Sequence, residues 1–100
     1  MTWPRILVLA LCTLPVGARG ADDAAARSLA ATCANCHGTE GRPVARDIPG
    51  LAGMPRDKIV ADMKAFKSGA RPATVMHQLA RGYTDAQIDR LAEYFAGRKD

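Results

Sequence analysis

The sequence predicts a small all-α domain in which about four helices wrap around a bound group. Three observations support this prediction. Apolar residues recur three and four positions apart in several segments after residue 20, and no segment alternates apolar and polar residues as a half-buried strand does. Helix-starting and helix-stopping residues separate these segments. The domain has few aromatic residues, so its own side chains make only a marginal core.

Residues 1–20 are predicted to form a secretory signal peptide. Arg5 precedes an apolar run over residues 6–14, and small residues follow at the spacing that a signal peptidase recognises. We therefore expect cleavage near Gly20–Ala21, a periplasmic location, and one domain over residues 21–100.

Membrane and nucleic-acid binding are both disfavoured. The apolar run is too short to span a bilayer, and the bulky Leu11 disfavours lipid modification of Cys12, so no stable membrane anchor is expected. The formal charge falls from +4 to +2 when Arg5 and Arg19 leave with the leader, and the remaining charges of both signs are interspersed. Because the sequence has no basic run with interleaved aromatic residues, no nucleic-acid binding is expected.

The first helix is predicted within residues 22–37. Asp22 and Asp23 stand at its start, where they suit the positive end of the helix dipole, and it is expected to end near Cys33 or just past it. Its apolar stripe consists of Ala26, Leu29, Ala30 and Cys33. Residues 38–54 then hold four glycines and two prolines. We expect a long irregular segment there, and such segments in small domains are usually functional.

Three further helices are expected. The second covers residues 54–69, has Pro55 in its first turn, where proline fits, and ends at Gly69. A short helix follows from about Thr74 to Gly82. The last helix begins with a capping box formed by Thr84 and Gln87. The predicted core residues of the second and last helices are Ile59, Val60, Met63, Phe66, Ile88, Leu91, Ala92 and Phe95.

The chemically distinctive stretch is CANCH, in which Cys33 and Cys36 stand three positions apart and His37 follows directly. A disulfide between the cysteines would close a very short loop and add little constraint. A structural zinc site needs four ligands, but His77 is the one other histidine and Cys12 lies in the leader. A redox dithiol of the thioredoxin type needs strands alternating with helices, and the sequence predicts none.

A covalently bound haem fits every constraint. Cys-x-x-Cys-His is the attachment pattern of c-type haem. Its two sulfurs reach the vinyl groups on one edge of the porphyrin, and the next imidazole can bind the iron. Haem also supplies the large buried group that the small core lacks. Cys33, Cys36 and His37 are therefore predicted to hold one covalent haem c.

The second axial ligand has several candidates. Met63 lies on the apolar face of the second helix, where core packing explains it. Met54 lies at a helix start, and the sequence argues only weakly for or against it as a ligand. Met76 follows a loop about forty residues beyond His37, so the chain can return on the opposite face of the haem. His77 points about 100° away from its neighbour in a helix, so only one of the two can face the iron. The residues favour Met76 and leave His77 open.

Four segments together resemble a small class I bacterial cytochrome c, over roughly residues 25–97. They are CANCHGTEG, IPGLAGM, MKAFKSGARPATVM and GYTDAQIDRLAEYFA. More narrowly, GLAGMPRDKIVADMKAFKSGARPATVM resembles the monohaem cytochrome subunit of flavocytochrome c sulfide dehydrogenase. Related dihaem cytochromes c of proteobacteria share KSG, the methionine and the LAEYFA helix; they have two CxxCH motifs, where this sequence has one.

The resemblance implies roles for the residues of the motif and its partners. Cys33 and Cys36 match the thioether cysteines, and His37 matches the proximal ligand. Met76 matches the distal ligand because it closes the RPATVM segment. His77 departs from the pattern, in which a small residue is commoner after the ligand methionine.

Two residues of the irregular segment also match the family. Pro49 matches the proline whose carbonyl accepts a hydrogen bond from the proximal imidazole, which fixes the ring and makes the ligand more basic. Leu51 matches a residue that packs on the haem.

Outer-sphere electron transfer is the expected function, because two protein ligands leave no room for a substrate at the iron. No catalytic residue is assigned. The resemblance favours the haem subunit that accepts electrons from an FAD-containing flavoprotein oxidising sulfide, with other redox proteins as acceptors. The alternative is a free soluble carrier that shuttles electrons between respiratory or photosynthetic complexes. A haem with an open catalytic position is a third hypothesis, which applies if Met76 does not bind.

Overall fold

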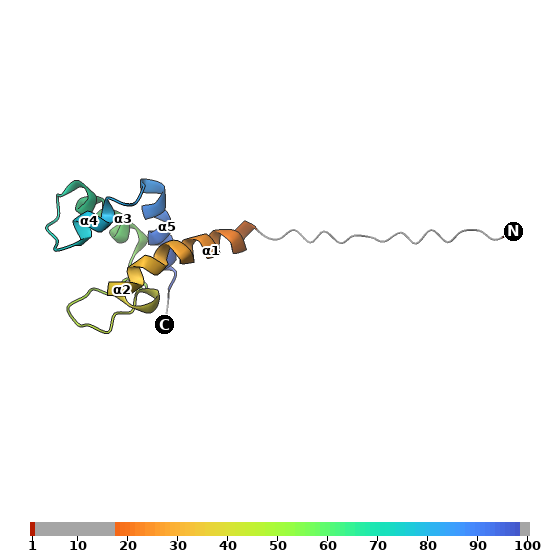
Figure 1. Cartoon of the computed structure of the whole chain (residues 1–100), viewed down its shortest axis with the longest axis horizontal. Helices are drawn as coiled ribbons and strands as arrows, with labels where there is room; N and C mark the ends of the chain where they lie inside the picture. The colour runs from red at the N-terminus through yellow and green to blue at the C-terminus, as the bar shows by residue number, and fades with distance from the viewer. Residues whose placement is uncertain (2–17, 99–100) are drawn as a thin grey trace.

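The computed structural model describes Met1 and residues 18–98, and this part of the chain contains helices and turns but no strand (Figure 1). The elements are α1 (Ala18–Ala30), η1 (Ala31–Cys33), α2 (Ala34–His37), η2 (Thr39–Gly41), α3 (Arg56–Ser68), α4 (Met76–Ala80) and α5 (Asp85–Ala96). The prediction of an all-α fold is confirmed. The two η elements are single 3₁₀ turns that the sequence pattern did not predict.

Most of the predicted signal peptide lies outside the described residues, so its cleavage near Gly20–Ala21 stays a prediction. The first described helix, α1, begins at Ala18 and has no acidic residue in its first turn. The prediction that Asp22 and Asp23 start the helix is therefore wrong. The helix extends further because the residues just ahead of Asp22, apart from one glycine, are strong helix formers. Between residues 18 and 98, no helix is long and apolar enough to cross a membrane.

The helical stretch that carries the cysteines was expected to end near Cys33 or just past it, and it runs on to His37. After α1 it tightens into the 3₁₀ turn η1 and resumes as α2. The backbone stays right-handed helical at the junctions, with φ of −70° at Ala30, −71° at Cys33 and −63° at Ala34. Cys33, Cys36 and His37 are therefore presented from one nearly continuous helical segment.

The core is built around α5. This helix packs against α1 and α3, and α3 also packs against α4. The capping box of α5 is present as predicted: the Gln87 amide donates to Thr84 Oγ1 at 3.1 Å, and the Thr84 amide donates to Gln87 Oε1 at 2.9 Å. The buried core residues among those described are Ala30, Ile59, Met63, Ala80, Ile88, Leu91, Ala92, Tyr94 and Phe95.

The irregular segment between η2 and α3 is docked on the helices by its backbone. The amides of Leu51 and Ala52 donate to the Gly41 carbonyl at 2.8 and 3.2 Å, and the Gly53 amide donates to the Phe95 carbonyl at 2.9 Å. Gly41 has φ of +80°, and a Cβ there would lie 2.7 Å from the Ala52 nitrogen. Only glycine fits this position without displacing the backbone.

Candidate functional site

A cleft separates the helical stretch that carries the cysteines from α3 and α4. It consists of two adjoining pockets, which share the lining residues His37, Ile59, Met63 and Met76. The first pocket has an empty volume of about 630 Å³ and is called here the cysteine half. The second has an empty volume of about 1170 Å³ and is called the charged half.

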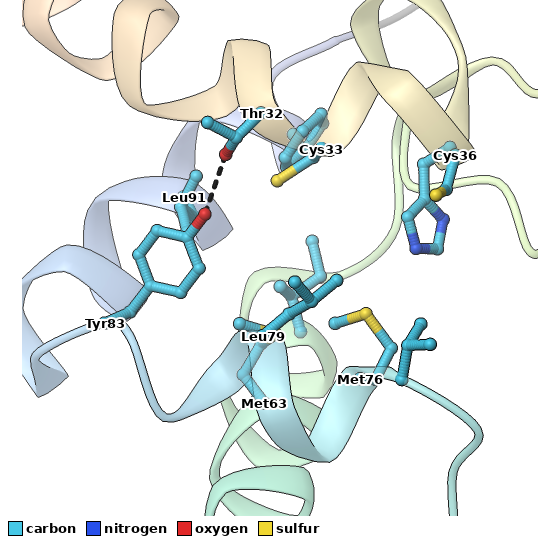
Figure 2. A pocket seen from close by; sticks show the side chains of 12 residues that line it. Thr32, Cys33, Cys36, Met63, Met76, Leu79, Tyr83 and Leu91 are labelled. Carbon is cyan, nitrogen blue, oxygen red and sulfur yellow. Dashed lines mark hydrogen bonds between the residues drawn. The ribbon is translucent and has the colours of Figure 1, made fainter.

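The cysteine half is almost entirely apolar. Besides the shared residues it is lined by Thr32, Cys33, Cys36, Val75, Leu79, Tyr83, Leu91 and Phe95. Figure 2 shows Cys33 and Cys36 on one wall, facing Met76 and Leu79 of α4 on the other. The two cysteines do not form a disulfide with each other. Burial raises the pKa of the Cys33 thiol, and a hydrogen bond with Thr32 offsets part of that rise.

His37 presents one nitrogen to the cleft because the other is held. Its Nδ1 lies 2.8 Å from the carbonyl oxygen of Pro49. A carbonyl oxygen only accepts hydrogen bonds, so Nδ1 carries a proton, and in the neutral ring Nε2 then keeps its lone pair. This is the tautomer that a metal-binding imidazole needs, and a hydrogen bond from the far nitrogen makes such a ligand more basic.

Met76, which the sequence favoured, and His77, which it left open, lie differently. Met76 opens α4 and lines both halves of the cleft, with its sulfur pointing into it (Figure 2). His77 lines neither half. Its Nδ1 is buried and has no hydrogen-bond partner among the described residues. The structure thus brings Met76, not His77, to the cleft that His37 also lines.

The other methionines and Leu51 have distinct places. Met63 is a buried core residue, as its position on the apolar face of α3 predicted, and it also lines both halves of the cleft. Met54, Pro49 and Leu51 line the charged half. Every residue predicted to contact the haem therefore lines this one cleft.

A hydrogen bond across the cysteine half joins two residues to which the sequence analysis gave no role in the site. The hydroxyl oxygens of Thr32 and Tyr83 lie 2.7 Å apart (Figure 2), and Lys67 donates to the Tyr83 carbonyl at 2.5 Å. Thr32 directly precedes Cys33. The one signal in the sequence was that Tyr83 is among the few aromatic residues of the domain.

Charged side chains line the other half of the cleft. Asp47, Lys58, Asp62 and Arg71 lie there, together with Phe66, Pro72 and Ala73. The sequence gave no signal for this cluster, because interspersed charges ordinarily form a solvated surface.

The donor atoms fit a haem better than a zinc ion. Across residues 18–98, no three His, Cys, Asp or Glu side chains gather as a metal site built from them would require. Instead the cleft offers two thiols at one end, an imidazole nitrogen and a thioether sulfur. These are the groups that attach and ligate haem iron in c-type proteins, and the apolar lining suits a porphyrin.

The chain belongs to the cytochrome c family, because the family model for cytochrome c matches residues 23–98. It is an electron-transfer protein whose cofactor is haem c. Cys33, Cys36 and His37 form its CxxCH haem-binding motif. The prediction of a class I c-type cytochrome is confirmed.

Three relatives illustrate the range of similar proteins. The cytochrome subunit of sulfide dehydrogenase from Chlorobaculum tepidum is 42% identical over 67 residues, which are 67% of this chain and 60% of that protein. Cytochrome c4 from Pseudomonas aeruginosa is 36% identical over 98 residues, 95% of this chain and 49% of that protein. The thiosulfate dehydrogenase electron acceptor from Thiomonas intermedia is 38% identical over 100 residues, 96% of this chain and 46% of that protein. The chain thus spans about half to three fifths of the length of these relatives.

Proposed function

We propose that this cytochrome c is the haem subunit of a periplasmic sulfide-oxidising flavoprotein, with His37 and Met76 as the axial ligands of its iron. The observation that carries the ligand assignment is that both side chains line both halves of the cleft and that Met76 points its sulfur into it (Figure 2), whereas Met63, which also lines both halves, is a buried core residue. The haem, when bound, supplies a one-electron couple between ferric and ferrous iron. The work of the protein is to hold that couple at a chosen potential near the surface.

Each proposed site residue has a definite task. Cys33 and Cys36 anchor the vinyl edge of the haem through thioether bonds. Pro49 holds the His37 ring by the 2.8 Å hydrogen bond to Nδ1, leaving Nε2 for the iron. The soft Met76 thioether favours ferrous iron and so raises the reduction potential.

The surroundings of the ligands also raise the reduction potential. Leu51, in the charged half, is proposed to pack on the haem, and the apolar cysteine half excludes water. An apolar environment disfavours the additional charge of ferric haem. With two protein ligands on the iron, transfer is outer-sphere: an electron enters and leaves while no bond is made or broken.

The partner is proposed from a relative. The Chlorobaculum relative, 42% identical, is itself a cytochrome subunit of sulfide dehydrogenase. We therefore propose an FAD-containing subunit as electron donor and a second redox protein as acceptor.

A free electron carrier is the second candidate function. The cytochrome c4 relative, at 36% identity and over 95% of this chain, fits this alternative as well as the sulfide dehydrogenase subunit fits the first. The Thiomonas relative, a thiosulfate dehydrogenase electron acceptor, adds another kind of donor enzyme for such a carrier.

Native purification separates the two functions. The protein is tagged at its C-terminus in its own host, isolated gently, and examined for absorption spectrum and co-eluting chains. We expect a haem c spectrum together with flavin and a second, larger chain. A haem c spectrum on a lone small chain would instead establish the free carrier and refute the subunit proposal.

A further inference from the structure

Three charged side chains in the charged half form one connected group. Lys58 Nζ lies 2.7 Å from Asp62 Oδ2, and an Arg71 guanidinium nitrogen lies 3.0 Å from Asp62 Oδ1. Asp62 thus joins a cation of its own helix, α3, to a cation of the loop that leads to α4. All three residues line the cleft, as does Asp47.

Arg71 is held in place at further points. Its backbone amide donates to the Ala65 carbonyl at 3.1 Å, and its guanidinium lies 4.8 Å from the centroid of the Phe66 ring. Phe66 also lines the charged half. A cation stacked on an aromatic ring and paired with a carboxylate is oriented rather than freely solvated.

Helix stability is a weak explanation for this group. The side chains of Lys58, Asp62 and Arg71 are 54%, 26% and 48% exposed, and ion pairs at such exposure contribute little to folding. Within α3 the lysine precedes the acid by four residues, which is the less favourable order. Aspartate is also a poor helix former in a helix interior. The group therefore calls for another explanation.

The ionisation of Asp62 agrees with a charged cluster. Burial alone would raise the pKa of its carboxyl group, but hydrogen bonds and charge from Lys58 and Arg71 outweigh burial and lower that pKa overall. Asp62 is therefore ionised at neutral pH, with a cation on each of its carboxylate oxygens.

The position of the group relates it to one edge of the haem. The two cysteines line only the cysteine half, and the Lys58, Asp62 and Arg71 side chains line only the charged half. The vinyl groups of a haem lie on one side of the ring and its two carboxylates on another. If Cys33 and Cys36 fix the vinyl edge, as proposed above, the carboxylates lie in the charged half.

We propose that Lys58 and Arg71 provide the positive charge that the two haem carboxylates require, and that Asp62 is the positioning residue that orients both cations. This inference rests on the proposed function, because it uses the orientation set by the two cysteines. Together with Asp47, which lines the same half, the three side chains determine the net charge at that edge of the haem. Asp62 then stabilises ferric iron, and the two cations stabilise ferrous iron.

The test is the reduction potential of the purified holoprotein, measured by spectroelectrochemical titration. Asp62→Asn should raise the potential and Arg71→Gln should lower it. Asp62→Glu, which keeps the charge, should stay near the wild-type potential. Asp57→Asn is the matched control, because Asp57 lies on the same helix, is 96% exposed and lines neither half. The shift caused by Asp62→Asn should be several times that of the control.

A second pair of variants keeps the test decisive if Arg71→Gln fails to fold. Lys58→Gln should lower the potential, whereas Lys64→Gln, an exposed position on α3 outside both halves, should change it much less. Equal shifts in Asp62→Asn and Asp57→Asn, or in Lys58→Gln and Lys64→Gln, would overturn the proposal.

Failure of the proposed ligand set would look different. It would show in the wild-type protein, as a missing methionine–iron absorption band in the ferric state and as carbon monoxide binding to the ferrous state. The reduction potential would still test the charge proposal in that case. Its shifts in Asp62→Asn and Arg71→Gln depend on the charge at the haem edge and should keep opposite signs.

Discussion

The two walls of the cleft are built in different ways. The wall that carries His37 is tied by backbone hydrogen bonds, from Leu51 and Ala52 to the Gly41 carbonyl and from Gly53 to the Phe95 carbonyl. The wall that carries Met76 is the five-residue helix α4, which begins without a side-chain cap. Its next residue, His77, has a buried nitrogen with no partner among the described residues.

The difference indicates that changes in the His37 wall affect folding, whereas changes in the Met76 wall affect the chemistry of the haem. A backbone-tied wall resists displacement, so a change there is expected to cost folding and haem retention. A short helix held by side-chain packing on α3 can lose a ligand while the rest of the domain stays folded. The predictions below test this distinction, from the largest expected effect to the smallest.

Cys33→Ser is expected to give the largest effect. One of the two thioether bonds cannot form, and the small core cannot retain the haem by packing alone, so the variant should carry a weakened single attachment or yield no stable holoprotein. The measurement is haem content per chain after denaturation. The matched control is Cys12→Ser, which lies in the predicted leader and should leave haem content unchanged. Normal haem content in Cys33→Ser would contradict the attachment.

Gly41→Ala should destabilise the folded holoprotein by about 2–4 kcal/mol, since it combines an unfavourable φ with a backbone collision. The collision is with the Ala52 nitrogen, 2.7 Å from the added Cβ. Denaturant unfolding measures the loss. Gly69→Ala is the control, because Gly69 has φ of +81° but nothing within 4 Å of an added Cβ. It should lose only about 1–2 kcal/mol. Equal losses at both positions would show that close packing of the His37 wall is unimportant.

Met76→Ala should keep the haem covalently attached while changing its chemistry. Loss of the thioether should lower the reduction potential and let the ferrous iron bind carbon monoxide. The stability should change less than in Gly41→Ala, because the smaller side chain collides with no backbone atom. His77→Ala is the control and should leave the spectrum and the potential close to those of wild type. An unchanged spectrum and potential in Met76→Ala would show that Met76 is not the ligand.

Thr84→Ala should have the smallest effect of this series. It removes the side-chain oxygen that accepts from the Gln87 amide at the start of α5, which should cost about 1 kcal/mol of stability. Because Thr84 lines neither half of the cleft, the variant should unfold earlier without any change in potential. A shift in potential would show that loosening the start of α5 also changes the surroundings of the haem.

The sequence by itself determined the elements whose signals are local. The helical spacing of apolar residues predicted α3 and α5. Thr84 and Gln87, which lie within one stretch of four residues, predicted the cap of α5. The CxxCH motif gave the haem, because two thiols and an imidazole within five residues need no knowledge of the rest of the chain. The start of α1 was misjudged, because two acidic residues suit a first turn but are also tolerated inside a helix.

Only the tertiary structure decided which residues that lie far apart in the sequence come together at the cleft. The sequence favoured Met76 without excluding His77, and only the structure shows that Met76 lines the cleft and that His77 does not. The contact of His37 with Pro49, twelve residues away, was available only through family resemblance. The grouping of Asp62 with Arg71 in the cleft had no signal at all. Spacing along the chain fixes which side chains share a helix face, whereas loop closure and packing decide which faces meet.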